Sequence, residues 1–271
     1  MNKLLRADFF RLKKDLIFWF FIFFTMVFSG INIFKYCSST GQIILDKVLN
    51  EFIMYICLFI AIFISIFVGK EYSEVIIRNK IIVGHSRITI YLSKLIITII
   101  VSILCELIYV IIILLVGLPL FGRLQMSASQ IAISMLNTFL VIIVYCSIFN
   151  FITMICSEIT VSIIINILIV IIMFIIEVSV GYIANSPKYS THSYLEDGIE
   201  YIISQEPNPN YPGDAKVNLA KTIYLFTPQG QATKIANMDI ESLYQMPIYS
   251  VSLMIIINII GLYLFSRKEL K

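Results

Sequence analysis

Charged side chains are scarce in this sequence. Asp, Glu, Lys and Arg make up 14% of its 271 residues, well below the roughly 25% that is usual in soluble domains. Apolar residues make up 59%, and the mean hydropathy is +0.92. A soluble core cannot hide this much apolar surface. The composition therefore excludes an ordinary soluble domain and predicts an integral membrane protein.

Sequence motifs of nucleotide-binding, metal and catalytic sites are also missing. There is no GxxxxGK[ST] loop, so the chain lacks the usual phosphate cradle for ATP. The two histidines, His85 and His192, are far apart in sequence and no HExxH occurs, which argues against a metal or catalytic site. An intramembrane enzyme would also need paired aspartates or a Ser–His pair. We therefore expect no catalytic residue, metal ligand or cofactor in this chain, and no nucleic-acid partner.

Cysteine is infrequent, and its spacing does not suggest disulfides. No CxxC occurs, and all but Cys37 lie inside apolar runs. Buried cysteines of this kind behave as small hydrophobes. We expect that role for four of them: Cys57, Cys105, Cys146 and Cys156.

Six apolar runs are long enough to cross a membrane. A helical span needs about 20 mostly apolar residues, and in lipid a helix satisfies its own backbone. The predicted spans are residues 17–36, 52–69, 95–118, 131–156, 162–184 and 248–265. The first run has no small-residue cleavage site, so we expect it to remain as an anchor.

Basic residues are concentrated in three segments that six spans would place on one side. The first 15 residues hold five, the segment Lys70–Lys94 holds five, and the tail holds Arg267, Lys268 and Lys271, which is 13 of the 20 in the chain. The positive-inside rule makes this side cytoplasmic, with both termini. Abundant Ile, Asn and Lys with little Ala suggest an AT-rich bacterial genome, and so a bacterial plasma membrane.

The N-terminal segment is amphipathic. Its apolar residues fall within about 60° of a helical wheel: Leu5, Phe9, Leu12 and Leu16. Its basic residues lie on the other side. We expect an interfacial helix that contacts membrane lipid and turns into the first span.

A long external loop is expected over residues 185–247. A possible capping box at Ser193 and Glu196 predicts a helix at its start. Residues 217–226 predict a second short helix, and a third can precede Pro247. The interspersed Tyr and Phe favour helices that lie on the outer leaflet.

The segment after the second span, EYSEVIIRNKIIVGHSRITIYLSK, is both charged and apolar. Residues 72–83 can form about three helical turns, with Gly84 as a C-terminal cap and Ser86 as the cap of the next helix. We predict a short cytoplasmic helix at this place.

Apolar side chains point to two sides of this helix. Ile82 and Val83 lie on a broad face, whereas Ile77 and Ile81 lie roughly opposite, near Glu74. One membrane-facing surface cannot hide both sets. We expect one face to contact the helix bundle and the other a partner protein; a loop folded back on its own bundle is the alternative.

Some polar groups lie inside the predicted spans. Glu106, near the middle of span three, is costly there unless it is paired or hydrated. Glu106, Asn137 and Glu177 are candidates for a substrate pathway or for helix packing. For the asparagines in the spans, hydrogen bonds between helices are the favoured explanation.

The charged segment resembles the stretch between spans two and three of type-2 ATP-binding-cassette (ABC) exporter permeases. That family has an acid, a Gly-Thr pair, Arg-Asn-Lys, a Gly, Ser-Arg and Ser-Lys. The matching residues are Glu71, Arg78, Asn79, Lys80, Gly84, Ser86, Arg87, Ser93 and Lys94. Val75 and Ile76 stand where the family has Gly-Thr. The order of elements and an ending like GLYLFSRKELK are also similar.

The resemblance implies an all-α integral membrane protein with one transmembrane domain over residues 1–271. It implies an N-terminal interfacial helix, six transmembrane helices, a cytoplasmic coupling helix after span two and a large loop before span six. The partners would be a second permease chain, identical or related, and an ABC ATPase subunit that binds ATP and magnesium. The expected ATPase contacts are Glu71, Glu74, Ile77, Arg78, Lys80, Ile81 and Arg87.

The function implied is export of an amphiphilic substrate such as an antimicrobial peptide, a drug or a lipid. Two other classes stay open. A secondary transporter or channel would need inverted repeats or broken spans with paired charges. A membrane scaffold or sensor would need no transport machinery at all.

Overall fold

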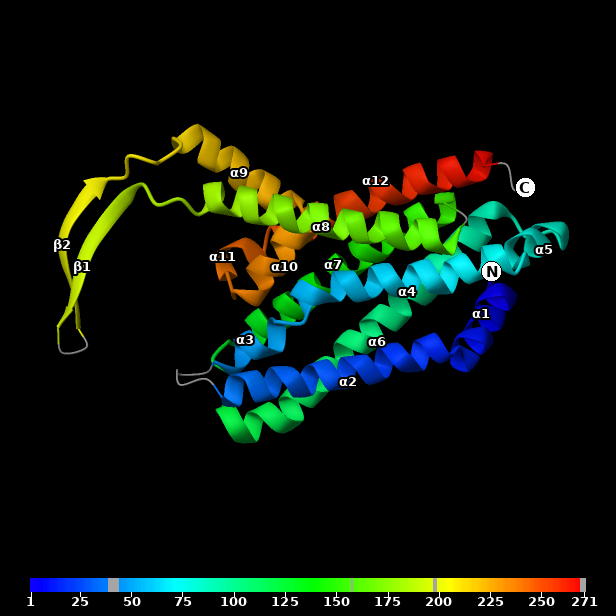
Figure 1. Cartoon of the computed structure of the whole chain (residues 1–271), viewed down its shortest axis with the longest axis horizontal. Coiled ribbons are helices and arrows are strands. Elements are labelled where there is room, and N and C mark those ends of the chain that lie inside the picture. The colour runs from blue at the N-terminus through cyan, green and yellow to red at the C-terminus, as the bar shows by residue number, and fades with distance from the viewer. Residues whose placement is uncertain (39–43, 157, 197–198, 269–271) are drawn as a thin grey trace.

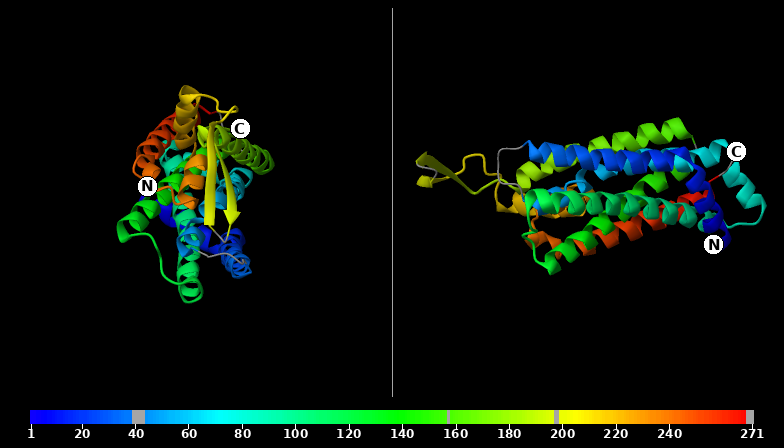
Figure 2. Two further views of the ribbon diagram at one scale, coloured as in Figure 1. Left: turned by 90° about the vertical axis from the view of Figure 1, so that its left-hand side faces the viewer. Right: turned by 90° about the horizontal axis from the view of Figure 1, so that it is seen from below.

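The protein is described here from a computed structural model of the chain, over residues 1–38, 44–156, 158–196 and 199–268. Figure 1 shows an elongated bundle of helices. The N-terminus, the short helix α5 (Ile76–Ile82) and the end of the last helix lie at one end, which we call the α5 end. A β-hairpin projects from the opposite end, the hairpin end, as Figure 1 and the right-hand view of Figure 2 show. Lys271 of the basic tail lies outside the described residues.

The structure confirms the prediction of six helices that are long and apolar enough to cross a membrane. They are α2 (Leu16–Cys37), α4 (Ile53–Ser73), α6 (Arg87–Phe121), α7 (Ala128–Cys156), α8 (Ile159–Ala184) and α12 (Met246–Arg267). Several extend beyond the predicted apolar runs. Helix α6 begins well before residue 95, because Ser86 caps it: the Ser86 side-chain oxygen accepts from the backbone N–H of Thr89 at 3.2 Å.

Helices α4 and α7 form the centre of the bundle, and α8 and α12 lie outside them with many exposed apolar side chains. Gly69 of α4 lets Ile159 of α8 come close, since a Cβ there would lie 2.9 Å from an Ile159 carbon. Gly261 of α12 does the same for Tyr91 of α6, at 2.4 Å from the hydroxyl oxygen. Small residues at such contacts are typical of packed membrane helices.

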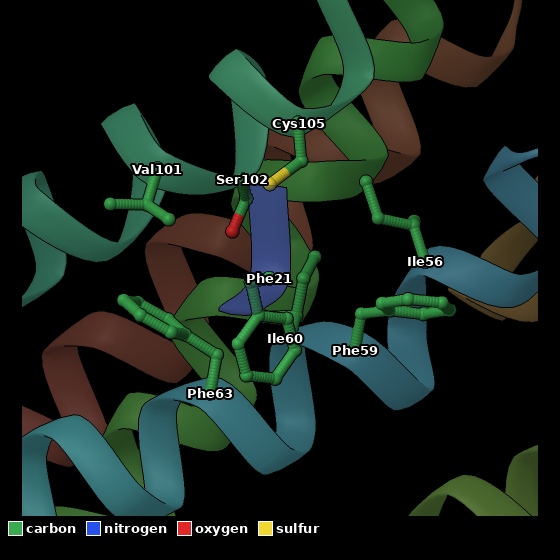
Figure 3. Close-up of a pocket in the computed structure, with 8 residues that line it drawn as sticks. All are labelled: Phe21, Ile56, Phe59, Ile60, Phe63, Val101, Ser102 and Cys105. Atoms are coloured by element: carbon green, nitrogen blue, oxygen red, sulfur yellow. The ribbon is translucent and has the colours of Figure 1, made fainter. Parts of the chain in front are cut away.

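The space between α2, α4 and α6 is closely packed. Figure 3 shows Phe21, Phe59 and Phe63 together with Ser102 and Cys105 around it. The cavity left among them measures about 10 Å³, which is room for about one water. This cavity is therefore too small for a substrate.

Asparagines join the long helices, as the sequence predicted. The Asn166 side chain of α8 donates to Ser65 of α4 at 2.7 Å and to Thr153 of α7 at 3.0 Å. Asn258 of α12 donates to Ser147 of α7 at 2.9 Å. Each bond satisfies polar groups inside an apolar bundle.

The prediction of a helix around Ser193 and Glu196 is wrong. The chain there forms an antiparallel hairpin of β1 (Tyr189–Glu196) and β2 (Ile199–Pro207), with a register shift at His192 and Ser193. The first segment has two Tyr and one Thr, and the second has three Ile and one Tyr; β-branched and aromatic residues of this kind favour strands. An Asp-Gly pair stands between them in the sequence, which is a frequent hairpin connection.

The two other helices expected in this loop are present: α9 (Asp214–Phe226) and α11 (Ile240–Leu243), which precedes Pro247. Helix α10 (Pro228–Ala236) lies between them in the sequence and was not predicted, and α3 (Leu45–Asn50) precedes α4. Helix α10 contacts both α4 and α7 through Gln229, which is fully buried. Its side-chain oxygen accepts a hydrogen bond from the Tyr145 hydroxyl of α7 at 2.8 Å, and its side-chain nitrogen donates to the Met54 carbonyl of α4 at 3.4 Å. It closes the bundle at the hairpin end (Figure 1).

Candidate functional site

Four elements meet at the α5 end: helix α1 (Asn2–Lys14), the last turn of α4, helix α5 and the first turns of α6. Helix α1 turns one face toward the others. Leu4, Asp8 and Leu12 follow each other at four-residue spacing and are all buried. Asp15 then caps α2 by accepting from the backbone N–H of Ile17 at 3.1 Å. This places α1 across the end of the bundle.

Charged side chains from these four elements form a cluster that we call the buried ion network. Its members are Asp8, Arg11, Glu71, Glu74, Lys80 and Lys94. Three are acids and three are bases, so the formal charges balance. Unbalanced charge would be costly in such a place.

The lysines bridge the acids of two different helices. The Lys80 amine lies 2.8 Å from Asp8 Oδ1 and 3.0 Å from Glu71 Oε2. The Lys94 amine lies 2.8 Å from Asp8 Oδ1 and also contacts Glu71. Ser93 donates to the second oxygen of Asp8 at 2.7 Å. Helices α1, α4, α5 and α6 are thereby joined through two carboxylates.

Arginine 11 completes the network at its edge. Its guanidinium lies 2.7 Å from Glu71 Oε1 and 3.4 Å from Glu74 Oε2. The Glu71 carboxylate therefore contacts three basic side chains, from α1, α5 and α6.

In this network, burial and ion pairing shift the pKa values of the side chains in opposite directions. The side chains of Glu71 and Lys94 are 0% exposed. Burial by itself raises the pKa of Asp8, but the charges of Lys94 and Lys80 outweigh it and hold that pKa below its usual value. Burial likewise lowers the pKa of Lys80, but Glu71 and Asp8 outweigh it and raise that pKa. Asp8 and Lys80 therefore stay charged at neutral pH.

The predicted helix over residues 72–83 is wrong at its start. Helix α4 continues to Ser73, the helical conformation is interrupted at Val75, and α5 begins at Ile76. Val75 has φ 59° and ψ 15°, in the left-handed region that L residues avoid. The break turns α5 away from the axis of α4 so that Lys80 can reach back to Glu71.

The predicted cap at Gly84 is confirmed. Gly84 has φ 98°, and its N–H bonds the Ile81 carbonyl at 2.9 Å while the N–H of His85 bonds the Lys80 carbonyl at 3.1 Å. This is the Schellman pattern of a helix C-terminus.

The structure separates the expected ATPase contacts into buried and exposed side chains. Glu71 and Ile77 are buried, and the Lys80 side chain is 14% exposed, so these three face the protein interior. Ile81 is half-buried, and Glu74 is exposed but paired with Arg11. Contact of these five residues with an ATPase stays a prediction. The other two expected contacts are Arg78 and Arg87.

Arg78 is exposed on α5, whereas Arg87 is bound within the chain. The Arg87 guanidinium donates to the Phe265 carbonyl at 3.1 Å and to the Lys268 carbonyl. Lys268 in turn donates to the carbonyls of Met154 and Ile155, at 2.8 and 2.6 Å. Burial lowers the pKa of Lys268 to about 8. Arg87 therefore joins α6 to the end of α12.

The outer side of α5 carries an unusual surface, which we call the exposed α5 face: Val75, Arg78, Ile82 and Val83. Ile82 and Val83 are 73% and 77% exposed, whereas Ile77 on the other side is 1% exposed. The two apolar sides that the sequence predicted are thus one buried and one exposed.

The three candidates inside the spans do not meet. Glu106 is buried in α6, and its Oε2 has no hydrogen-bond partner among the described residues. Asn137 of α7 donates to the Leu243 carbonyl at 2.8 Å, and Glu177 of α8 accepts from the Tyr224 hydroxyl at 2.9 Å. Each lies in a different helix with its own surroundings. Within the described part of the chain, no three His, Cys, Asp or Glu side chains could hold a metal ion.

Sequence reasoning assigned no site role to Asp8, Arg11 or Lys94. Two signals were present. Asp8 is the one acid in the first 14 residues and lies between Leu4 and Leu12 on one helix face. Lys94 lies at the edge of a long apolar run, where a lysine needs an acid partner.

Comparisons with known proteins give no family for this chain. No protein-family model matches it, and no curated protein matches it. The resemblance to ABC exporter permeases therefore depends on the residues of the charged segment and on the order of elements.

Proposed function

We propose that this chain is the permease subunit of an ATP-driven exporter and that α5 is the helix on which a separate ABC ATPase acts. One observation carries the proposal: α5 is fixed to three other helices by the buried ion network, while its outer face is exposed and apolar. A short helix with exposed Ile and Val beside an arginine is suited to a groove on a partner protein.

The buried ion network gives α5 a way to move other helices. Removing one partner from a buried ion pair typically costs about 3–5 kcal/mol. A displacement of Lys80 alone would separate it from both Asp8 and Glu71. It is therefore easier for α1, α5 and the adjoining ends of α4 and α6 to move as one body. Arg87 extends this body to α12.

The arrangement of charge supports a cytoplasmic α5 end. The N-terminus, α5 and the end of α12 lie together there (Figure 1). The first 15 residues, the segment Lys70–Lys94 and the tail carry 13 of the 20 basic residues. The positive-inside rule then places both termini in the cytoplasm of a bacterial cell.

A second permease chain fits the distribution of apolar surface. The cavity in Figure 3, among side chains of α2, α4 and α6, is too small for cargo. Helices α8 and α12 expose broad apolar faces. A path between two chains would use such faces, and its lining would suit an amphiphilic cargo such as an antimicrobial peptide, a drug or a lipid.

The test is co-purification with an ABC ATPase, which is to be sought first among the neighbouring reading frames. The variant Arg78→Glu/Ile82→Ser/Val83→Ser changes three exposed side chains. We expect at least tenfold less bound ATPase, since the loss of central apolar contacts at an interface costs about 1–2 kcal/mol each. Arg87 is left unchanged because it holds α12.

The matched control is Arg123→Glu, which reverses an exposed charge after the far end of α6. It should leave the yield of ATPase unchanged. The triple variant should keep the thermal stability of the wild type, because its side chains face solvent. Normal co-purification and transport by the triple variant would refute the role of α5.

A further inference from the structure

A polar cleft of about 450 Å³ lies at the hairpin end, between the last turns of α8, the base of the hairpin, α9 and α10. Its lining contrasts with the apolar faces around it. It includes one carboxylate, two tyrosines and four asparagines: Glu177, Tyr182, Tyr224, Asn185, Asn208, Asn210 and Asn237. These residues come from separate elements, so the cleft exists only in the folded chain.

The carboxylate of Glu177 is held in place by α9. Gly181 lies one turn after Glu177, and a Cβ at Gly181 would lie 2.9 Å from a ring carbon of Tyr224. The missing side chain lets Tyr224 lie against α8. Its hydroxyl then donates to Glu177 Oε1 at 2.9 Å. The acid is therefore positioned at the wall of the cleft before any ligand arrives.

Glu177 is the one charged residue among those that line the cleft. The lysines near it have acids of their own. Lys188 pairs with Asp214 at 3.2 Å, and Lys234 pairs with Asp239 at 2.5 Å. The cleft therefore keeps a net negative charge.

We propose that this cleft binds the ammonium group of an amphiphilic molecule that the transporter exports. The proposal rests on the proposed function and adds the chemical class of its substrate. Glu177 supplies the charge, the ring face of Tyr182 attracts a cation, and the asparagine carbonyls accept its remaining N–H groups. The Tyr224 ring does not take this part, because the Lys234 amine already lies 5.9 Å from its centroid. The apolar part of the molecule lies along the exposed side of α8, where Val178 is 65% exposed.

The experiment uses the full chain, purified in nanodiscs of zwitterionic lipid. The probes are two dansyl-labelled ten-carbon chains, one ending in a primary amine and one in an alcohol, and binding is followed by fluorescence anisotropy. We expect wild-type protein to bind the amine at least tenfold more tightly than the alcohol, because hydrogen bonds to charged groups contribute about 1.5–3 kcal/mol.

Two variants test the residues. Glu177→Gln should weaken amine binding about tenfold and leave alcohol binding unchanged. Tyr224→Phe, which frees Glu177 Oε1, should weaken amine binding by a smaller factor. Glu206→Gln is the matched control, since Glu206 is an exposed acid on β2 outside the cleft lining, and it should bind both probes like the wild type.

Equal affinity of the wild type for both probes would overturn the proposal, and so would an unchanged amine affinity of Glu177→Gln. This assay needs no ATPase. If the wild type shows no amine selectivity but co-purifies normally with the ATPase, only the proposal that the cleft binds an ammonium group is rejected. Amine selectivity without any ATPase partner would reject the proposed function alone.

Discussion

Val75 holds the chain in a left-handed turn between α4 and α5, a conformation that suits glycine better than a β-branched residue. The strain for an L residue is about 1–2 kcal/mol. It persists because the network on either side fixes both helices: Glu71 precedes the turn and Lys80 follows it. The turn thus stores strain at the place where α5 meets the bundle.

Val75→Gly should relieve this strain. A glycine adds conformational entropy to the unfolded chain, at a cost of about 0.5–1 kcal/mol, so the net gain is about 0–1.5 kcal/mol. Val75 is 46% exposed, so little packing is lost. The measurement is the unfolding midpoint of the purified protein in a mixed-micelle denaturant titration.

The control for this change is Val83→Gly. Val83 is also exposed but has φ −70° in the right-handed region, so glycine relieves no strain there. We expect Val83→Gly to be neutral or destabilising by up to about 1 kcal/mol. Equal effects at both positions would mean that the turn at Val75 is not strained.

Helix α1 acts as a strap across the α5 end. Asp8 reaches Lys80 and Lys94, and Arg11 reaches Glu71, so one short helix contacts three others through charges. The apolar residues Leu4 and Leu12 flank these contacts and keep water out. Ion pairs that are shielded from water are stronger, so α1 and α5 should separate from the bundle together rather than one at a time.

Asp8→Asn should loosen this strap and destabilise the protein by about 3 kcal/mol at pH 7, since Lys94 stays buried with one counter-charge fewer. The wild-type advantage is pH-dependent. The pKa of Asp8 is lower in the folded state than its usual value near 3.8, so its stabilisation is present above that value and is lost as the pH falls through the folded pKa. Denaturant unfolding of both proteins between pH 7 and pH 3 measures this.

Asp214→Asn is the matched control, because Asp214 pairs with Lys188 at the exposed hairpin end. Water and salt screen such an exposed pair, so little change is expected. A difference between Asp8→Asn and the wild type that does not shrink at low pH would show that the Asp8 charge is not the cause.

On the scale of the whole molecule, the two ends of the bundle differ in charge and in shape. The α5 end holds the buried ion network, and the hairpin end holds α9, α10, α11 and the polar cleft (Figure 1). If the α5 end is cytoplasmic and the chain exports a substrate as proposed, that substrate would leave at the end where the cleft lies. The orientation of the chain is therefore the first property to measure.

Cysteine labelling can measure it. Cys37 is exposed at the hairpin end of α2. We expect a membrane-impermeant maleimide to label it in intact cells. In a Cys37→Ser background, Asn79→Cys on exposed α5 should be labelled only after permeabilisation.

Cys37→Ser alone is the control, because it reports any labelling of the half-buried Cys156. Labelling of Asn79→Cys in intact cells, together with labelling of wild-type Cys37 only after permeabilisation, would show the opposite orientation. The exposed α5 face would then have no access to a cytoplasmic ATPase.

The sequence was sufficient for features that depend on neighbours along the chain. The six long helices follow from apolar composition over about 20 residues, and the caps at Gly84 and Ser86 follow from residue type at helix ends. The hairpin was missed because Ser193 and Glu196 match a capping pattern that says nothing of strand pairing. The break at Val75 was missed because local propensity does not favour a left-handed valine.

By itself, the sequence determined that this is an apolar chain with six helices able to span a membrane and a short charged helix after the second. Only the tertiary structure decided that Glu71 and Lys80 face inward, that Asp8 and Lys94 complete their pairing, and that Arg78 stays outside. The physical reason is distance. Apolar content is a sum over adjacent residues, whereas a buried charge depends on partners up to 86 positions away, as Lys94 does on Asp8.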